Sequence, residues 1–442
     1  AIRRLAPMPD SYLCPGESQP IGRAIHLARL ANFYAACQAC PHRDDTGLLP
    51  LATRKHLQQR AQLPERAPEF HADGVQGVFH NQLTVAAARR LAAAFAVVLR
   101  EQLRTAETLP REPVVVLAGD GRPITAEFLA AAGEGLRYCG CRVLETSSAT
   151  SGMLAFAMRQ QNADGGLLLG NPADRSHFVG LKFWGPGCLP WSRGKELNAI
   201  EQLHRSTINR PTRTAGSASR LVIEPDYLHG LEGYFHALRP LRLLLDTTSS
   251  TIKRLLRRLA ARVACTVIDD DDLAGSFTQA AADRESHRQR SARLGRRVLT
   301  AGADFGVWTD GDGEAVLLVD EQGREVPHER LLVVLARHLQ SEQPSRAVVI
   351  EPSESSAADL RLCGLLPHAS LAANASRRGM AAAMAERQAV LGGGASGRYW
   401  LPPSPAPDAL HLVAVLLTLL STRDWPLSEV IERCLEPAGS CR

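Results

Sequence analysis

Alternation between apolar strands and helical patterns constrains the fold of this chain more than any other feature. Residues 112–120 have the sequence EPVVVLAGD, a β-branched run between turn residues that predicts a buried strand. A helix is predicted at 125–140, a strand at 141–147, a helix at 152–163 and a third strand at 165–170. Because strand–helix–strand crossovers make neighbouring strands parallel, we expect a mostly parallel sheet with helices on both faces.

The same alternation returns twice further along the chain. Residues 241–272 predict strand, turn, helix and strand, whereas 329–340 predict a helix and 345–353 the strand after it. The polar stretches 210–219 and 281–291 are predicted junctions. Since 442 residues exceed one ordinary core, we expect three mixed-sheet α/β/α domains behind an N-terminal cysteine-containing helical segment. The expected bounds are 1–62 for the segment and 63–210, 211–322 and 323–442 for the domains.

Composition excludes several classes of partner. The net charge is +5, but basic and acidic residues are interspersed and aromatic residues make up only 5%, so we expect no nucleic-acid partner. The apolar stretch 409–420 is shorter than the ~18 residues of a membrane span, and it predicts a buried helix. No apolar run follows the N-terminal arginines, so we expect a cytoplasmic protein whose ten cysteines are mostly reduced.

Residues 305–326 predict strand, turn and strand, with three acidic residues in the turn. Asp310, Asp312 and Glu314 alternate with glycines, which let the backbone curl so that several carboxylates can face one point. Such a cluster of oxygen ligands suits Mg²⁺. The alternative is a polar hairpin turn without a ligand, because Asp-Gly is itself a strong hairpin signal.

The N-terminal segment contains a candidate metal site of a different kind. Cys37 and Cys40 form a C-x-x-C pair, Cys14 precedes them, and His42 follows by two residues. Three cysteines and a histidine can bind Zn²⁺ tetrahedrally, and cysteines with a fourth ligand can also hold an iron–sulfur cluster. A single C-x-x-C is a weak signal, so a small helical cap with free thiols, or a disulfide, remains the alternative.

The helix expected before this pair bears on a second histidine. Pro20 and the apolar spacing after it predict a helix of about four turns that runs towards Cys37. On an unbroken helix, His26 would lie eleven residues and ~16 Å from Cys37. We therefore expect His26 to pack against its surroundings rather than bind a metal.

Five segments, taken in order, resemble the phosphohexomutases, the phosphoglucomutase/phosphomannomutase superfamily. The segments are 70–96, 114–125, 162–184, 304–323 and 392–400. In this order, they are similar to the family's FGTDGIRG, GRDTRPSS, TASHNPPEYNG, DGDGD and GGEQSG regions. The resemblance implies α/β/α domains and a phosphoserine that passes a phosphoryl group between positions of a hexose phosphate. It also implies Mg²⁺ beside that phosphate and a fourth domain that grips the second phosphate.

Carried over residue by residue, the resemblance is incomplete. The nucleophilic serine falls on Pro172, which has no hydroxyl to phosphorylate, so no catalytic residue is expected there. Ser176 is the nearest hydroxyl. Asp310 and Asp312 match the first two metal-binding aspartates, and Glu314 replaces the third.

The ligand-binding positions are also altered. Gly394 replaces the sugar-loop glutamate and Arg398 the histidine, whereas Ser396 and Arg122 match the family. We expect Arg122, Ser396 and Arg398 to bind ligand. The resemblance ends near Trp400, so we expect the fourth domain to be missing.

We therefore expect a catalytically degenerate phosphohexomutase-like protein that acts as a binding, scaffold or regulatory protein. In the regulatory case, a metal or iron–sulfur cluster in the N-terminal segment would control the rest of the protein. The alternative is an active sugar-phosphate enzyme, an intramolecular phosphotransferase with a rebuilt active site. The expected partners are a sugar phosphate or another anion, and a protein partner or a second copy of the chain.

Overall fold

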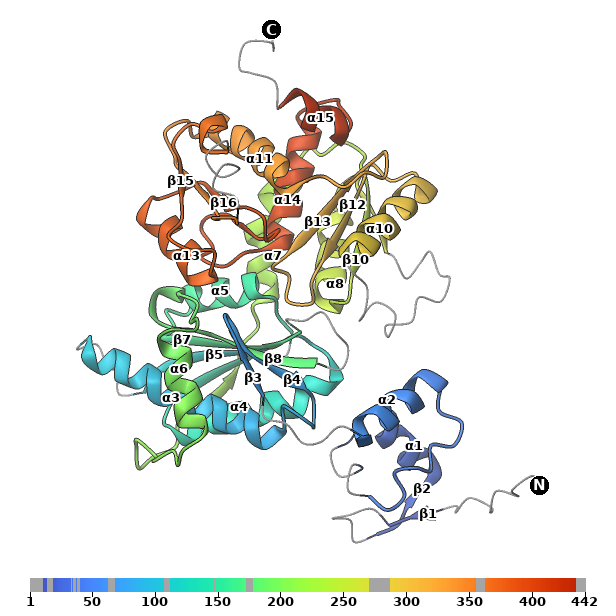
Figure 1. Ribbon diagram of the computed structural model, residues 1–442, viewed down its shortest axis with the longest axis vertical. Coiled ribbons are helices and arrows are strands. Elements are labelled where there is room, and N and C mark those ends of the chain that lie inside the picture. The colour runs from blue at the N-terminus through green and yellow to red at the C-terminus, as the bar shows by residue number, and fades with distance from the viewer. Residues whose placement is uncertain are drawn as a thin grey trace.

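The computed structural model describes residues 11–13, 19–32, 34, 37, 40–62, 68–106, 112–146, 148–171, 178–269, 287–354 and 362–434. Cys14, Pro172 and Ser176 lie outside these residues. Within them, three α/β bodies meet one another, and a small N-terminal unit stands beside them (Figure 1). In these ranges, no helix combines the length and the apolar character that a membrane crossing requires.

The first body is built on a seven-stranded mixed sheet of order β3-β4-β8-β7-β5-β6-β9. Its strands are β3 (Glu69–His71), β4 (Gly74–Val78), β5 (Val114–Gly119), β6 (Arg142–Thr146), β7 (Gly165–Gly170), β8 (Phe178–Trp184) and β9 (Ala218–Arg220). Strands β7, β5 and β6 are parallel, as predicted, and β9 pairs parallel with β6, whereas β8 pairs antiparallel with both β7 and β4. Part of the stretch predicted as a junction at 210–219 therefore belongs to this sheet, because it contains the start of β9.

Helices cover both faces of this sheet because its central strands alternate between two cores. Val115 and Leu117 of β5 pack in one cluster with α3 and α4, whereas Val116 packs with α5 in a second cluster. The helices are α3 (Val85–Thr105), α4 (Ala126–Tyr138), α5 (Ser151–Gln160) and α6 (Glu196–His204), with the short η2 (Pro123–Thr125) and η3 (Pro186–Cys188). The second cluster continues into the other two bodies, so α5 lies at the junction of all three.

The second body has a four-stranded sheet of order β11-β10-β12-β13. Its elements are α7 (Glu224–Glu232), η4 (Gly233–Phe235), β10 (Arg242–Thr247), α8 (Ser250–Ala260), β11 (Thr266–Asp269), α10 (His287–Ala301), β12 (Phe305–Thr309) and β13 (Val316–Asp320). Strands β12 and β13 form an antiparallel hairpin, so the acidic residues occupy its turn as predicted. The described part of the stretch predicted as a junction at 281–291 is the first turn of α10.

The third body has a sheet of order β15-β14-β16-β17. Its elements are α11 (His328–Glu342), β14 (Val348–Ile350), β15 (Ala369–Leu371), α13 (Arg377–Glu386), β16 (Leu391–Gly393), β17 (Tyr399–Trp400), α14 (Ala409–Ser421) and α15 (Leu427–Arg433). Helix α14 is the buried helix predicted at 409–420. It packs against η4 and shares a core with α8 and α11, which joins the second and third bodies (Figure 1).

The N-terminal unit consists of β1 (Ser11–Tyr12), β2 (Ile21–Gly22), α1 (Arg23–Ala31) and α2 (Leu51–Gln62). The predicted four-turn helix is shorter than expected, since α1 has nine residues and ends before Cys37. The reason is local: the side chain of Asn32 donates a hydrogen bond to the Ala28 carbonyl at 2.8 Å, which caps the last turn.

Candidate active site between the three bodies

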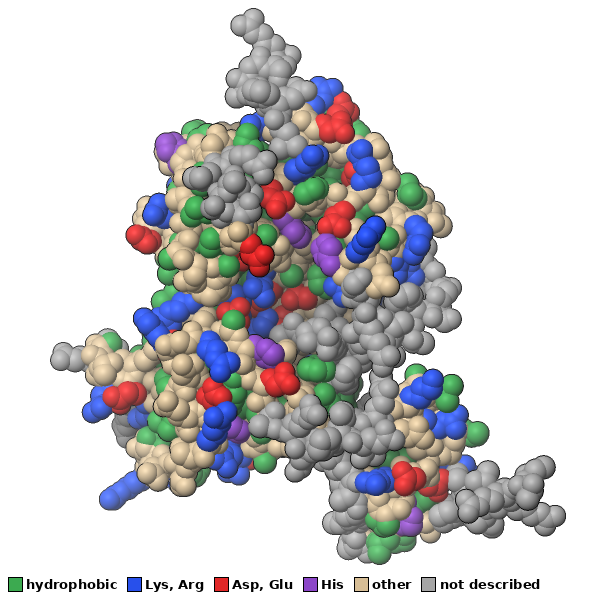
Figure 2. Space-filling model, in the orientation of Figure 1, with side chains coloured by type: hydrophobic (Ala, Val, Ile, Leu, Met, Phe, Trp, Pro, Cys, Tyr) green, Lys and Arg blue, Asp and Glu red, His purple; other side chains and the backbone are tan. Residues whose placement is uncertain are grey.

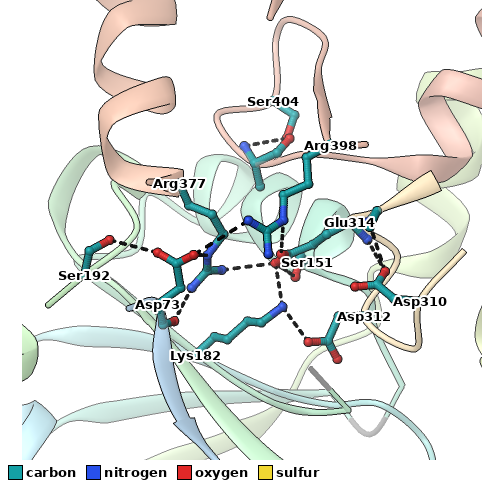
Figure 3. Close-up of polar contacts among 12 residues, drawn as sticks. Asp73, Ser151, Lys182, Ser192, Asp310, Asp312, Glu314, Arg377, Arg398 and Ser404 are labelled. Atoms are coloured by element: carbon teal, nitrogen blue, oxygen red, sulfur yellow. Dashed lines mark hydrogen bonds and ion pairs between the residues drawn. The ribbon is translucent and has the colours of Figure 1, made fainter. Parts of the chain in front are cut away.

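Charged side chains from all three bodies meet in a hollow at their junction. Figure 2 shows acidic and basic groups gathered there, and Figure 3 shows how they face one another. Beside them lies a cavity of about 240 Å³, lined among others by Asp73, Gln76, Lys182 and Arg398. The cavity therefore opens between the β3–β4 turn, strand β8 and the segment before β17.

Lys182 is the basic residue that the first body contributes. It stands on β8 between Leu181 and Phe183, which turn to the α3–α4 core, so alternation along the strand points Lys182 to the opposite face. Its ammonium nitrogen lies 2.5 Å from Asp312 Oδ2 and 2.8 Å from Glu314 Oε1. Burial alone would lower the pKa of Lys182, but these carboxylates outweigh it and raise the pKa.

Glu314 is the acceptor on which most of these contacts converge. Its Oε1 accepts a hydrogen bond from Ser151 Oγ at 2.6 Å and one from Arg377 Nη1 at 3.1 Å. Burial would raise the pKa of this carboxyl, yet the cations of Lys182, Arg377 and Arg398 hold it well below its ordinary value. Glu314 is therefore a buried carboxylate whose charge is compensated by three basic side chains.

Asp310 is held differently, by the turn itself. Its Oδ1 accepts hydrogen bonds from the backbone N–H groups of Glu314 at 2.7 Å and Ala315 at 3.1 Å. Burial raises the pKa of Asp310 to about 7 against the lowering effect of Lys182, and the nearby carboxylates of Asp312 and Glu314 raise it further.

Asp312 fastens the acidic turn to the end of β7. Its Oδ1 accepts a hydrogen bond from the Asn171 backbone N–H at 2.7 Å. Gly170 makes this approach possible, because a Cβ at that position would lie 2.1 Å from Asp312 Oδ1. The segment that leads to Pro172 therefore begins directly against the acidic turn.

The predicted Mg²⁺ ligands lie together on one turn, but each side chain contacts different partners. Among the described residues, no three His, Cys, Asp or Glu side chains are already gathered as a metal-binding group. The donor chemistry nevertheless suits Mg²⁺, since all three ligands are carboxylates and the raised pKa of Asp310 indicates a charge that its surroundings do not fully offset. Magnesium binding by Asp310, Asp312 and Glu314 thus stays a prediction.

Arg377 is a site residue that the sequence did not single out. It begins α13, is fully buried, and donates hydrogen bonds to the Asp73 carbonyl and to Glu314. Its guanidinium also stacks over the Trp184 ring, 5.1 Å from the centroid. No local pattern marks it, because its partners come from the first and second bodies (Figure 3).

Arg398 lies beside Glu314 and Asp73, and ligand binding by this residue stays a prediction. Its Nε is 3.6 Å from Glu314 Oε2 and its Nη1 is 3.7 Å from Asp73 Oδ2, and it lines the cavity. Burial would lower the pKa of Arg398, but Glu314 and Asp73 raise it overall. These ion pairs are long, and the Arg398 side chain is 27% exposed where it lines the cavity.

The other predicted ligand-binding residues hold the framework of the site. Ser396 is exposed, and its backbone N–H donates to Glu351 Oε2 at 2.8 Å. Gly394 lies so close to Glu351 that a Cβ there would be 2.6 Å from the Glu351 Cβ. Arg122 donates to Asp120 Oδ2 at 2.5 Å and to the Gly170 carbonyl at 3.0 Å, so it fixes the end of β7.

The predicted N-terminal ligands are only partly described. Cys37 and Cys40 are buried, and the His42 ring meets the Tyr12 ring edge-on at 5.4 Å. Cys14 lies outside the described residues. Among the residues that the structure covers, these side chains do not form a ready metal-binding group.

Comparison with known proteins agrees with this architecture. Residues 67–209 match the phosphoglucomutase/phosphomannomutase alpha/beta/alpha domain I family. A probable phosphoglucosamine mutase of Methanothermobacter thermautotrophicus is 23% identical over 84% of this chain and 79% of its own length. A probable phosphoglucosamine mutase of Methanosarcina acetivorans is 25% identical over 82% and 79%.

Solved structures show the same fold. A phosphoglucomutase/phosphomannomutase family protein of Burkholderia thailandensis superposes with a TM-score of 0.68 at 19% identity, over 81% of this chain and 78% of that one. A putative phosphomannomutase of Thermus thermophilus gives 0.68 at 20% identity, over 84% of both chains. Residues 67–209 therefore belong to the phosphoglucomutase/phosphomannomutase domain I family, and the three bodies share the α/β/α fold of these solved structures.

Proposed function

We propose that the cavity between the first and third domains binds the phosphate group of a hexose or hexosamine phosphate, and that the protein acts in sugar-phosphate metabolism. The observation that carries this proposal is that Lys182 and Arg398 line this cavity together, while Arg377 is paired with Glu314 beside them. The relatives named phosphoglucosamine mutase support the class of ligand and favour phosphoryl transfer as the reaction.

The charges around the cavity suit a phosphate ester. Arg398 would bind phosphate oxygens through its planar, multiply donating guanidinium, and Lys182 would add a compact charge behind it. Arg377 is tied to Asp73 and Glu314 and would hold the first and second domains in place around the ligand. Mg²⁺, if held by Asp310, Asp312 and Glu314, would neutralise charge on the bound phosphate.

Thermal unfolding with and without ligand tests this proposal. Glucosamine 6-phosphate at 100 times its Kd should stabilise the protein by about 2.7 kcal/mol, whereas glucosamine at the same concentration should have no effect. Arg398→Met should remove most of the stabilisation, measured against the unfolding of the same variant without ligand because the substitution also removes one of the cations near Glu314. Equal shifts with glucosamine, or an unchanged shift in Arg398→Met, would contradict the proposal.

A second candidate is binding without phosphoryl transfer. The position of the family's phosphoserine is Pro172, which carries no hydroxyl, and this favours a protein that binds sugar phosphates as a sensor or scaffold. Phosphorus NMR of glucosamine 6-phosphate with Mg²⁺ and a hexose bisphosphate distinguishes the two candidates. Interconversion of glucosamine 6-phosphate and glucosamine 1-phosphate supports phosphoryl transfer. Loss of this interconversion in Ser176→Ala would identify Ser176 as a rebuilt nucleophile. Binding without interconversion supports the second candidate.

A further inference from the structure

Glu351 lies at the end of β14, beside the segment that leads to Arg398. The parallel pairing of β14 with β16 ends at Ile350 and Gly393, and the Glu351 backbone N–H then donates to the Gly393 carbonyl at 2.8 Å. Gly394 is therefore the neighbour of Glu351 where the two strands end. A Cβ at Gly394 would lie 2.6 Å from the Glu351 Cβ, so Glu351 fills the space that a side chain at position 394 would need.

The carboxylate of Glu351 is buried with few partners. The residue is only 4% exposed, and Oε2 accepts a hydrogen bond from the Ser396 backbone N–H at 2.8 Å. Within the described part of the chain, Oε1 accepts no hydrogen bond and the carboxylate forms no ion pair. A carboxylate can accept about four hydrogen bonds, and buried polar groups nearly always have partners. Glu351 therefore has unused capacity for a hydrogen-bond donor.

The same segment connects this carboxylate to the cavity. The Arg398 backbone N–H donates to Ser396 Oγ at 3.3 Å, and the Arg398 side chain lines the cavity. Burial would lower the pKa of Arg398, but Glu314 and further carboxylates, Glu351 among them, raise it overall. The charge of Glu351 thus acts on the guanidinium that we expect the phosphate group to contact. A carboxylate at this place repels a phosphate group but accepts hydrogen bonds from neutral hydroxyl groups.

We propose that Glu351 binds hydroxyl groups of the sugar ring and so selects sugar phosphates from other phosphates at the cavity. This inference rests on the proposed function, because it requires the phosphate group at Arg398. Hydrogen bonds from hydroxyls to a carboxylate are charge-assisted and stronger than neutral ones. The Ser396 N–H fixes the carboxylate before the ligand arrives. Repulsion between carboxylate and phosphate would orient the ligand, with its phosphate group towards Arg398 and its hydroxyls towards Glu351.

Calorimetric titration of the full-length protein with three matched ligands tests this assignment. Glucosamine 6-phosphate has a hydroxylated ring, cyclohexylmethyl phosphate has a ring without hydroxyls, and inorganic phosphate has no ring. In Glu351→Gln, which keeps an acceptor for the Ser396 N–H, glucosamine 6-phosphate should bind about tenfold more weakly, as expected for one lost hydrogen bond to a charged group. The other two ligands should bind as before or slightly more tightly. Glu354→Gln, at an exposed position of the same segment, is the matched control and should change none of the three.

Glucose 6-phosphate distinguishes hydroxyl binding from recognition of the amino group. Glu351→Gln should weaken the binding of glucose 6-phosphate as much as that of glucosamine 6-phosphate, because both rings carry hydroxyls. Weaker binding of glucosamine 6-phosphate alone would show that Glu351 binds the ammonium group, and would overturn the hydroxyl assignment.

The remaining outcomes separate this inference from the proposed function. If none of the phosphates binds the unaltered protein, both proposals fall. If all of them bind and Glu351→Gln keeps the preference for glucosamine 6-phosphate over cyclohexylmethyl phosphate, the role of Glu351 is refuted and the phosphate-binding cavity stands. Equal weakening of all the ligands in Glu351→Gln would show a purely structural role for Glu351 and would also refute the inference.

Discussion

The ammonium nitrogen of Lys182 lies 2.5 Å from Asp312 Oδ2, which joins strand β8 of the first domain to the β12–β13 turn of the second. The same nitrogen also contacts Glu314 at 2.8 Å, and all three side chains are almost fully buried. Buried charges of this kind are costly unless they remain paired, so each partner is needed to keep the others in place.

Removing the cation should therefore destabilise the protein. Lys182→Met leaves Asp312 and Glu314 without their shared ammonium and should lower the free energy of unfolding by about 3–5 kcal/mol in denaturant titrations. Lys195→Met, on an exposed lysine, is the control and should change it by less than about 0.5 kcal/mol. Equal stability of both variants would show that the buried pairing contributes nothing.

The close approach of Gly170 to the acidic turn predicts a steric effect. In Gly170→Ala the new methyl group would meet Asp312 Oδ1 at 2.1 Å, so β7 and the turn must separate. We expect a loss of about 1–3 kcal/mol in unfolding free energy and weaker binding of glucosamine 6-phosphate. Gly364→Ala has no atom within 4 Å of its added methyl group and should be neutral or slightly stabilising. A neutral Gly170→Ala would refute this close packing.

Asp73 lines the cavity and competes with an anion for Arg398. Its Oδ2 lies 3.7 Å from the Arg398 guanidinium, whereas its Oδ1 accepts from Ser192 at 3.2 Å. Asp73→Asn keeps an acceptor for Ser192 and removes the negative charge, so inorganic phosphate should bind up to about tenfold more tightly, ~1.4 kcal/mol. Calorimetric titration measures this change, and higher salt should reduce it. Weaker phosphate binding in Asp73→Asn would argue against an anion in this cavity.

A buried histidine between the second and third domains predicts acid sensitivity. Burial lowers the pKa of His411 despite the opposing charge of Asp408, and His411 Nε2 lies 3.0 Å from the Tyr234 hydroxyl. The unfolded chain therefore takes up a proton at higher pH than the folded protein, and stability falls as pH drops below about 6.5.

His411→Gln should accordingly lose less stability than the unaltered protein between pH 7 and pH 5. Denaturant titrations across this range measure the difference. His229→Gln, at an exposed position, should follow the unaltered protein. Parallel pH profiles for His411→Gln and the unaltered protein would show that His411 does not titrate with unfolding.

Much of the fold follows from local sequence pattern. The β-branched run of Val114–Gly119 and the glycine-ended helix after it are β5 and α4, and the Asp-Gly alternation at Asp310 is the turn of the β12–β13 hairpin. These elements are predictable because their periodicity matches one secondary structure over many residues. The α1 helix was overestimated because a single side chain, Asn32, ends it.

The site was predictable only within the segments that resemble the family, even where single residues in them differ from it. Arg398 was expected, and the acidic turn was expected as a cluster. Arg377 was not, because its role arises from contacts with Asp73 and Glu314, each on a different domain. The orientation of the carboxylates could not be predicted from the sequence either. It depends on a contact with Lys182, which lies on the sheet of another domain.

The most direct test of the proposed function is a crystal structure of the protein with glucosamine 6-phosphate. We predict that the phosphate group lies in the cavity beside Asp73 and contacts both Arg398 and Lys182. A phosphate bound elsewhere on the protein, with Arg398 still directed at Glu314 and the cavity filled only by solvent, would contradict the account.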